Sequence, residues 1–111
     1  MLVSFDIDGT LEVGEPPGPV KIDMVRRLAL KGWLVGSCSD RTVAFQKQMW
    51  KLQGITPKFT VLKHRLSDVK ITFPLEECYH VGDTDVDRMY SESSGFVFVE
   101  SGLAERWISG L

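Results

Sequence analysis

A chain of 111 residues has room for one domain with a hydrophobic core, and we expect residues 1–111 to form it. Apolar content of 43% and charged content of 25% are ordinary for a soluble globular protein, and a net charge of −2 argues against general nucleic-acid binding. No signal-like stretch precedes Asp6 and no apolar run approaches the length of a membrane span, so we expect no membrane partner and a cytoplasmic location.

Strand-like and helix-like segments alternate along the chain. The pattern predicts a strand at residues 2–5 (LVSF), a helix at 20–32, a strand at 33–38, a helix at 41–54 and a strand at 58–62. It continues with a short helix at 65–73, a strand at 78–82, a helix at 84–95, a fifth strand at 96–99 and a closing helix at 103–111. Strands that alternate with helices in this way pair in parallel through right-handed crossovers. We therefore expect an α/β three-layer sandwich on a doubly wound, Rossmann-like parallel sheet of about five strands.

Three of the predicted helices carry apolar residues at helical spacing, and these side chains are expected to face the sheet. They are Ile22, Val25, Leu28 and Ala29 in the first helix, Phe45, Met49 and Leu52 in the second, and Val86, Met89 and Tyr90 in the fourth. Cys38 and Cys78 lie in predicted strands and match no zinc-binding spacing, so we expect both to be small buried hydrophobic residues.

Polar side chains follow the ends of the first four predicted strands. They are Asp6 and Asp8, then Ser39, Asp40 and Arg41, then Lys63, His64 and Arg65, and finally Asp83, Thr84, Asp85 and Asp87. The carboxyl ends of parallel strands meet at one edge of an open sheet, which is where such sheets bind ligands. Asp6 and Asp8 are two like charges only one residue apart, so each raises the pKa of the other, and a cation would relieve the repulsion.

The residue types at this edge suit phosphate chemistry. Carboxylates such as Asp6, Asp83 and Asp87 are the oxygen ligands that Mg²⁺ prefers. The hydroxyl of Ser39 and the cationic amine of Lys63 suit a phosphoryl group. A carboxylate beside Mg²⁺ and a phosphate can attack phosphorus, and a second carboxylate can protonate the leaving group and later activate water.

Three stretches resemble motifs of the haloacid dehalogenase (HAD) superfamily. DIDGT, residues 6–10, resembles the first motif, D-x-D-G-T, and WLVGSCSDR, residues 33–41, is similar to the second, with Ser39 as its hydroxyl. GDTDVD, residues 82–87, resembles the fourth motif, G-D-x-x-x-D. The motifs occur in the family's order, and the first and fourth together form a specific signature.

The resemblance implies a role for each matching acid. Asp6 would be the nucleophile and a Mg²⁺ ligand. Asp8 would be the general acid/base and would bind Mg²⁺ through its backbone carbonyl. Asp83 would bind the metal and Asp87 would support it. The acid at position 8 places the chain with phosphatases or phosphotransferases of the family, because dehalogenase members generally lack it.

The phosphoryl group would be held by Ser39 and by the lysine of the third motif. Two lysines are candidates for that motif, and Lys63 is favoured because a strand end can reach the edge of the sheet. Lys70, one or two turns into a helix, remains the alternative. His64 stands where the family often has proline, and its role is left open. The cationic residues between Lys58 and Lys70 form either a basic lip for an anionic substrate or a solvated helix face.

We therefore expect a Mg²⁺-dependent phosphatase, a phosphoric monoester hydrolase with an aspartyl-phosphate on Asp6. A phosphotransferase and a non-catalytic phosphate- or metal-binding module remain alternatives. Asp8 and Ser39 are separated by 30 residues, and Ser39 and Lys63 by 23, so neither interval has room for the family's cap domain, which needs about 40. Residues 11–20 (LEVGEPPGPV) would form only a short flap. Closure of the site would then come from a macromolecular phosphorylated substrate or from a neighbouring subunit of a homo-oligomer.

Overall fold

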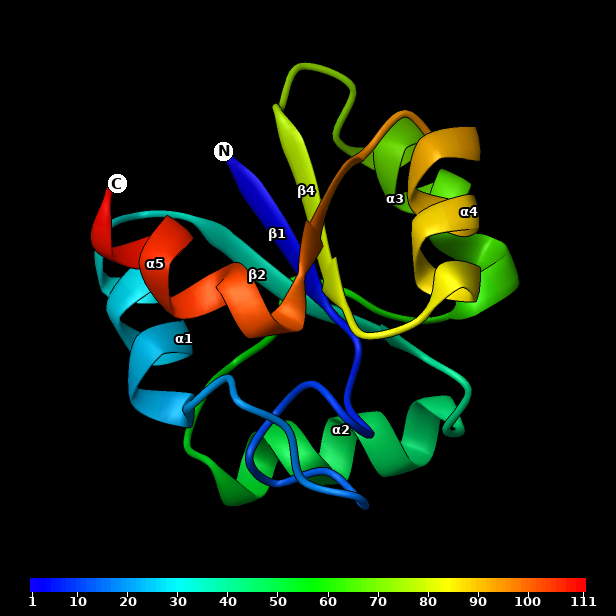
Figure 1. The fold of residues 1–111 in the computed structure, drawn as a ribbon. Helices are drawn as coiled ribbons and strands as arrows, with labels where there is room; N and C mark the ends of the chain where they lie inside the picture. Colours follow the sequence, from blue (N-terminus) through cyan, green and yellow to red (C-terminus); the bar gives the residue numbers. More distant parts are fainter.

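The computed structural model describes residues 1–111 and contains a five-stranded, all-parallel sheet in the order β3-β2-β1-β4-β5 (Figure 1). The strands are β1 (Leu2–Phe5), β2 (Leu34–Ser39), β3 (Thr60–Leu62), β4 (Cys78–Gly82) and β5 (Val97–Glu100). The helices are α1 (Ile22–Leu30), α2 (Val43–Leu52), α3 (Leu66–Thr72), α4 (Asp85–Ser93) and α5 (Ala104–Ser109), with short 3-10 turns η1 (Lys63–Arg65) and η2 (Ser101–Leu103). The α/β sandwich and all ten predicted elements are confirmed, with bounds that differ by a few residues.

Helices cover both faces of the sheet, with α1, α2 and α5 on one side and α3 and α4 on the other (Figure 1). Successive side chains of a strand point to opposite faces, so β1 sends Val3 and Phe5 into the larger core under α1, α2 and α5. Leu2 instead joins the smaller core under α3 and α4. Because helices cover both faces of the sheet, both faces of its central strands are buried.

Helix α1 faces the sheet as predicted, whereas α2 does so only in part. Ile22, Val25 and Leu28 of α1 are buried, and Ala29 is half-buried against the core. In α2, Met49 is buried as expected, but the predictions for Phe45 and Leu52 are wrong because these side chains are 42% and 72% exposed. The inward positions beside Met49 belong to Gln46 and Trp50, both fully buried.

The predicted face of α4 is right for Tyr90 and wrong for Val86 and Met89. Val86 and Met89 are 48% and 54% exposed, and Tyr90 is half-buried against the smaller core. Asp87 and Ser91 are the buried side chains of this helix. A carboxylate therefore points inward at the first turn of α4, at the end of the helix that lies next to the carboxyl end of β4.

The structure has no cap domain. The intervals in which a cap would be inserted contain only a loop with α1 and β2, and α2 with β3. The loop at residues 11–20, which we call the flap, is closed by a β-bridge between Leu11 and Val20. Cys38 and Cys78 are both buried and free, as predicted. No helix of the structure combines the length and the apolar character that crossing a membrane requires.

Candidate active site

A pocket of about 250 Å³ opens at the carboxyl edge of the sheet, where β1, β2 and β4 end. Its lining residues are Asp6, Asp8, Gly9, Pro16, Ser39, Asp40, Lys63, Asp83 and Thr84. Five of these were predicted as site residues from the sequence, and they come from four separate segments of the chain. The sixth, Asp87, lies buried beneath the pocket and contacts Lys63.

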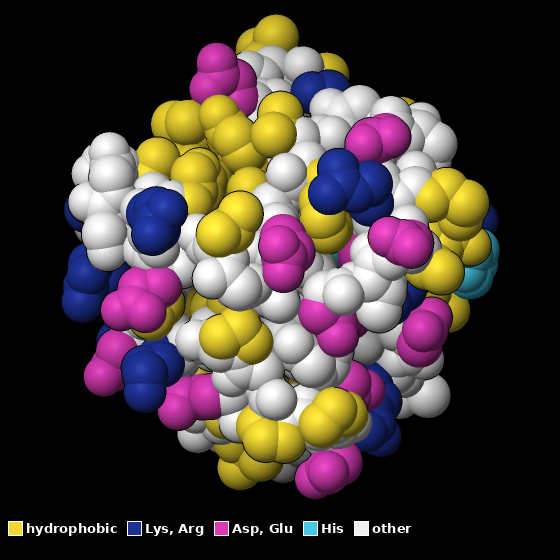
Figure 2. Space-filling model, in the orientation of Figure 1, with side chains coloured by type: hydrophobic (Ala, Val, Ile, Leu, Met, Phe, Trp, Pro, Cys, Tyr) yellow, Lys and Arg dark blue, Asp and Glu magenta, His cyan; other side chains and the backbone are white.

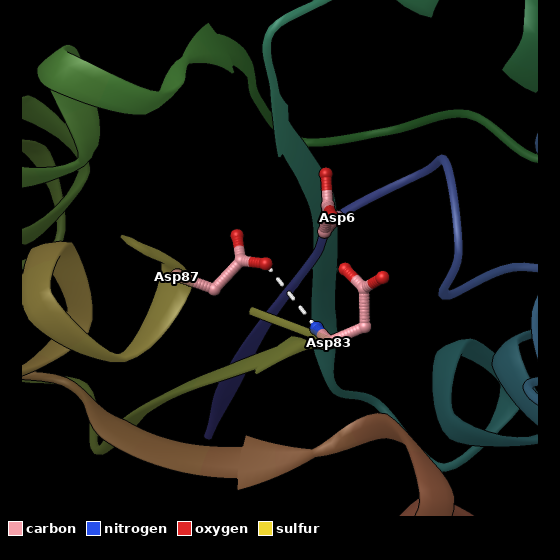
Figure 3. Close-up of side chains that lie close together, drawn as sticks. All are labelled: Asp6, Asp83 and Asp87. Atoms are coloured by element: carbon pink, nitrogen blue, oxygen red, sulfur yellow. Dashed lines mark hydrogen bonds between the residues drawn. The ribbon is translucent and has the colours of Figure 1, made fainter. Parts of the chain in front are cut away.

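Three carboxylates converge at the bottom of the pocket. Asp6, Asp83 and Asp87 each place an oxygen within 4.8 Å of the others, and Figure 3 shows them pointing toward a common space. Two glycines make room for them. A Cβ atom at Gly9, whose φ is +74°, would lie 2.0 Å from Asp83 Oδ2, and one at Gly82 would lie 2.5 Å from Asp87 Cγ. The glycines of both motifs therefore have a steric reason to be there.

The capping of α4 explains why Asp87 points inward. Thr84 accepts a hydrogen bond from Asp87 N at 3.1 Å, and the Asp87 carboxylate accepts from Thr84 N and Thr84 Oγ1 at 3.2 and 2.9 Å, which is a capping box. Asp83 N also donates to this carboxylate at 3.2 Å (Figure 3). These donors hold Asp87 Oδ2, so its other oxygen is left to face Lys63 and His80.

Lys63 is the cation of the buried half of the site. Its amine lies 3.3 Å from Asp87 Oδ1, 3.8 Å from Asp6 Oδ2 and 3.6 Å from Asp40 Oδ2. Lys70, the alternative from the sequence, is turned away from the pocket and donates to the carbonyl of Glu76 at 3.2 Å. Of the two candidate lysines, Lys63 is therefore the one that lines the pocket.

The buried carboxylates differ in how readily they ionise. Burial, reinforced by the charge of Asp87, raises the pKa of Asp6 from 3.8 to about 8, although Lys63 opposes the change. Burial also disfavours the charged form of Asp87, but its hydrogen bond to His80 and the charges of His80 and Lys63 outweigh this and lower its pKa. Burial likewise disfavours the charged amine of Lys63, and the carboxylates of Asp6 and Asp87 outweigh it and raise that pKa. Of these two buried carboxyl groups, Asp87 is therefore the one that is ionised when no further cation is bound.

Asp8 sits at the rim of the pocket. Its carboxylate accepts from Arg41 Nε at 2.8 Å, from Arg41 Nη2 at 3.3 Å and from the backbone N–H of Glu15 in the flap at 2.9 Å. Slight burial opposes ionisation of Asp8, but the hydrogen bonds from Arg41 and Glu15 outweigh it and lower its pKa. Asp8 is thus held as a carboxylate above the pocket.

Ser39 reaches the pocket from the end of β2. Its hydroxyl accepts a hydrogen bond from Arg41 N at 3.0 Å, so its proton is free to point toward a ligand. Ser37, two residues earlier, is instead buried among Gln46 and Trp50. Ser39, the hydroxyl predicted from the sequence, is therefore the serine of β2 that reaches the pocket.

The predicted basic lip does not form a continuous surface. Lys63 is turned inward, Arg65 pairs with Asp68 at 2.6 Å, and Lys70 is bonded to a carbonyl. His64 is exposed and does not line the pocket. These cationic residues therefore serve separate contacts.

Two buried polar residues near the site escaped the sequence interpretation. His80, in β4, places Nε2 3.2 Å from Asp87 Oδ1 and Nδ1 2.9 Å from Ser4 Oγ. Gln46 donates from Nε2 to the carbonyls of Arg41 and Val61 at 2.9 and 3.0 Å. A histidine inside an apolar strand was a signal for the first, whereas nothing in the sequence marks Gln46.

The donor set of the pocket fits Mg²⁺. Three convergent carboxylates supply the hard oxygen ligands that this ion requires, and two of them are buried, which makes their mutual repulsion costly without a cation. Neither a protein-family model nor a curated protein matches the chain. The function of the site therefore has to be inferred from its geometry and from residue chemistry. Membership of the HAD superfamily stays a prediction from the motifs.

Proposed function

We propose that the protein is a Mg²⁺-dependent phosphatase that hydrolyses phosphate monoesters through an aspartyl-phosphate on Asp6. The observation that carries the proposal is the convergence in one pocket of a buried carboxylate, a second carboxylate at the rim, a cationic amine and a hydroxyl: Asp6, Asp8, Lys63 and Ser39. Asp6 would attack phosphorus and Asp8 would transfer protons. Lys63 would neutralise charge and Ser39 would position the phosphoryl group.

The metal would be held by Asp6, Asp83 and Asp87, with the backbone of Asp8 nearby. Bound there, Mg²⁺ would neutralise charge on the transferring phosphoryl group and favour the ionised form of Asp6. His80 and Thr84 hold the Asp87 carboxylate in its inward position.

In the first step a carboxylate oxygen of Asp6 attacks phosphorus, and the bond between phosphorus and the ester oxygen breaks. The leaving oxygen takes a proton from Asp8, which must be in its carboxyl form for this step although Arg41 and the Glu15 N–H favour the carboxylate. The hydroxyl of Ser39 and the amine of Lys63 hold the phosphoryl oxygens. The products of this step are the free alcohol and a phosphoryl group on Asp6.

In the second step the Asp8 carboxylate accepts a proton from water, which attacks the phosphorus of the aspartyl-phosphate. The acyl phosphate bond breaks, and phosphate leaves with Asp6 restored as a carboxylate. Arg41 and the Glu15 N–H hold Asp8 in the carboxylate form that this step requires.

The open pocket supports a second element of the proposal. The flap is short, no cap covers the pocket, and catalysis of this type benefits when water is excluded. A large phosphorylated substrate, or a neighbouring copy of the chain in a homo-oligomer, would close the site from outside.

The proposal is tested by phosphate release from an aryl phosphate with Mg²⁺ and with a chelator. Activity is expected with the metal and not with the chelator, and Asp6→Asn is expected to be inactive. Asp23→Asn is a matched control, because it makes the same change on a side chain of α1 that is 87% exposed. Full activity in chelator would refute the metal assignment. Activity retained in Asp6→Asn would refute the nucleophile, and Mg²⁺-dependent phosphate binding without turnover would indicate a binding module instead.

A further inference from the structure

An apolar groove of about 160 Å³ lies beside the candidate active site, between α2 and the flap. It is lined by Val13, Phe45, Gln48, Met49, Leu52 and Gln53. Val13 belongs to the flap, and the other five come from α2 or the residue that follows it. No charged side chain lines the groove. In Figure 1 the flap runs alongside α2, at the lower end of the view.

The walls of this groove are exposed apolar side chains. Val13, Phe45 and Leu52 are 37%, 42% and 72% exposed. In Figure 2, hydrophobic side chains lie among acidic and other side chains at the lower end of the view, where the flap is found. Exposed apolar side chains that stand singly need no explanation, but a set that lines one groove points to a binding surface.

Arg41 links the groove to the catalytic pocket. Its guanidinium carbon lies 4.7 Å from the centroid of the Phe45 ring, and its nitrogens donate to Asp8, which lines the pocket. The flap forms the other shared wall, because Pro16 lines the pocket and Val13 lines the groove. A molecule with its phosphoryl group in the pocket would therefore meet apolar surface on the Arg41 side.

We propose that this groove binds a ring-sized apolar part of the leaving group, so that the substrates are phosphate monoesters that carry an aromatic or similar apolar group. This inference rests on the proposed function. The side chains of the pocket are nearly all polar, so the pocket suits the phosphoryl group, and the rest of the ester has to lie outside it. The groove is the adjoining apolar space, and a cavity of about 150 Å³ is large enough to hold benzene.

The test compares propyl phosphate with phenylpropyl phosphate, two esters whose leaving groups have similar acidity and differ by the ring. Wild-type protein with Mg²⁺ is expected to show kcat/KM at least about tenfold higher for the phenylpropyl ester, the lower end of what apolar contacts contribute to discrimination in a pocket. Leu52→Ser should bring the ratio of the two kcat/KM values toward one. Leu30→Ser, which removes an 83% exposed leucine from α1, should keep the wild-type ratio.

Equal kcat/KM for the two esters in wild-type protein, or an unchanged ratio in Leu52→Ser, would overturn the inference and leave the proposed function intact. Failure to hydrolyse either ester would instead count against the proposed function. For that case, calorimetry with phenylpropanol and the Asp6→Asn protein tests the groove without turnover, and binding that is lost on adding Leu52→Ser supports it. A wild-type dimer that Leu52→Ser converts to a monomer would show that a second copy covers the groove, and would also overturn the inference.

Discussion

The candidate site has a buried half and a rim half that manage negative charge differently. In the buried half, Asp6 and Asp87 are 4% and 1% exposed and share the amine of Lys63. In the rim half, Asp8 has a guanidinium partner of its own, Arg41, and about a third of each side chain is accessible. The amine of Lys63 is shared by two buried carboxylates and also lies near the exposed Asp40, whereas Arg41 pairs with Asp8 alone.

This difference separates metal binding from proton transfer. A buried charge without a partner is costly, so the lower half gains most from a divalent ion and should control metal affinity and stability. A solvent-exposed ion pair contributes little to stability, so the upper half should control the protonation of Asp8 with little effect on folding. The four predictions below test this division, from the largest expected effect to the smallest.

Asp6→Asn is expected to cause the largest loss, roughly 10⁵-fold or more in kcat, which is the scale seen when a catalytic nucleophile is removed. The same change removes a carboxyl group whose ionised form is disfavoured by burial and by the charge of Asp87. Metal-free protein should therefore be no less stable at about pH 8 than the wild type. Phosphate release and urea unfolding in chelator measure the two effects, and a marked loss of stability would contradict the description of the buried half.

Asp8→Asn should lower kcat by about 10²–10⁴-fold, the usual contribution of a positioned acid/base. The loss should be smallest for esters with good leaving groups, because these need little protonation. Unfolding by urea should change little, since the Asp8–Arg41 pair is at the surface. A loss that is the same for good and poor leaving groups would rule out Asp8 as the acid of the first step.

Gln46→Leu tests the connection between the two halves, because its amide binds the carbonyl of Arg41 on the rim and that of Val61 two residues before Lys63. Loss of these bonds should reduce kcat by about tenfold to a hundredfold through misplaced groups. It should also destabilise the protein by about 1–3 kcal/mol, because buried carbonyls lose their donor. Lys51→Leu, at an exposed position of α2, is the control. Unchanged kcat in an equally destabilised Gln46→Leu protein would show that the amide is only structural.

The effect of one pH unit on metal-free stability should be the smallest of the four. The pKa of Asp6 is about 8 in the folded protein and 3.8 in the unfolded chain, so the folded state binds more protons between these values. Stability should therefore fall as the pH rises through this window, by at most about 1.4 kcal/mol per pH unit. The lowered pKa of Asp87 has the opposite sign, but its stabilisation is complete above the unfolded value and is lost only at lower pH.

Magnesium should cancel this fall, because the ion takes the place of the proton on Asp6. Urea unfolding at about pH 6 and about pH 8, with Mg²⁺ and with chelator, measures the change in the free energy of unfolding between the two pH values. The stabilisation by Mg²⁺ should be larger at the higher pH, and Asp6→Asn should show a flatter profile in chelator. A Mg²⁺ effect of equal size at both pH values would argue against a raised pKa at Asp6.

The sequence alone determined the element order, the parallel sheet and the edge at which the site lies. Apolar runs of strand length alternate with helical repeats, and parallel strands necessarily end at one edge. Asp6, Asp8, Ser39, Lys63 and Asp83 could be predicted as pocket residues for that reason, since each lies at the carboxyl end of a strand or within three residues after it. The absence of room for a cap could likewise be counted along the chain.

Only the tertiary structure decided which polar side chains are buried. Gln46 displaces Phe45 from the inward face of α2 because Ser37, Arg41 and Val61 satisfy its amide, and none of these partners is visible as a pattern in the helix itself. His80 is buried because Ser4, 76 residues away, and Asp87 provide its hydrogen-bond partners. Periodicity reports where apolar groups leave water, but the burial of a polar group depends on partners from distant segments, and those are fixed only when the chain has folded.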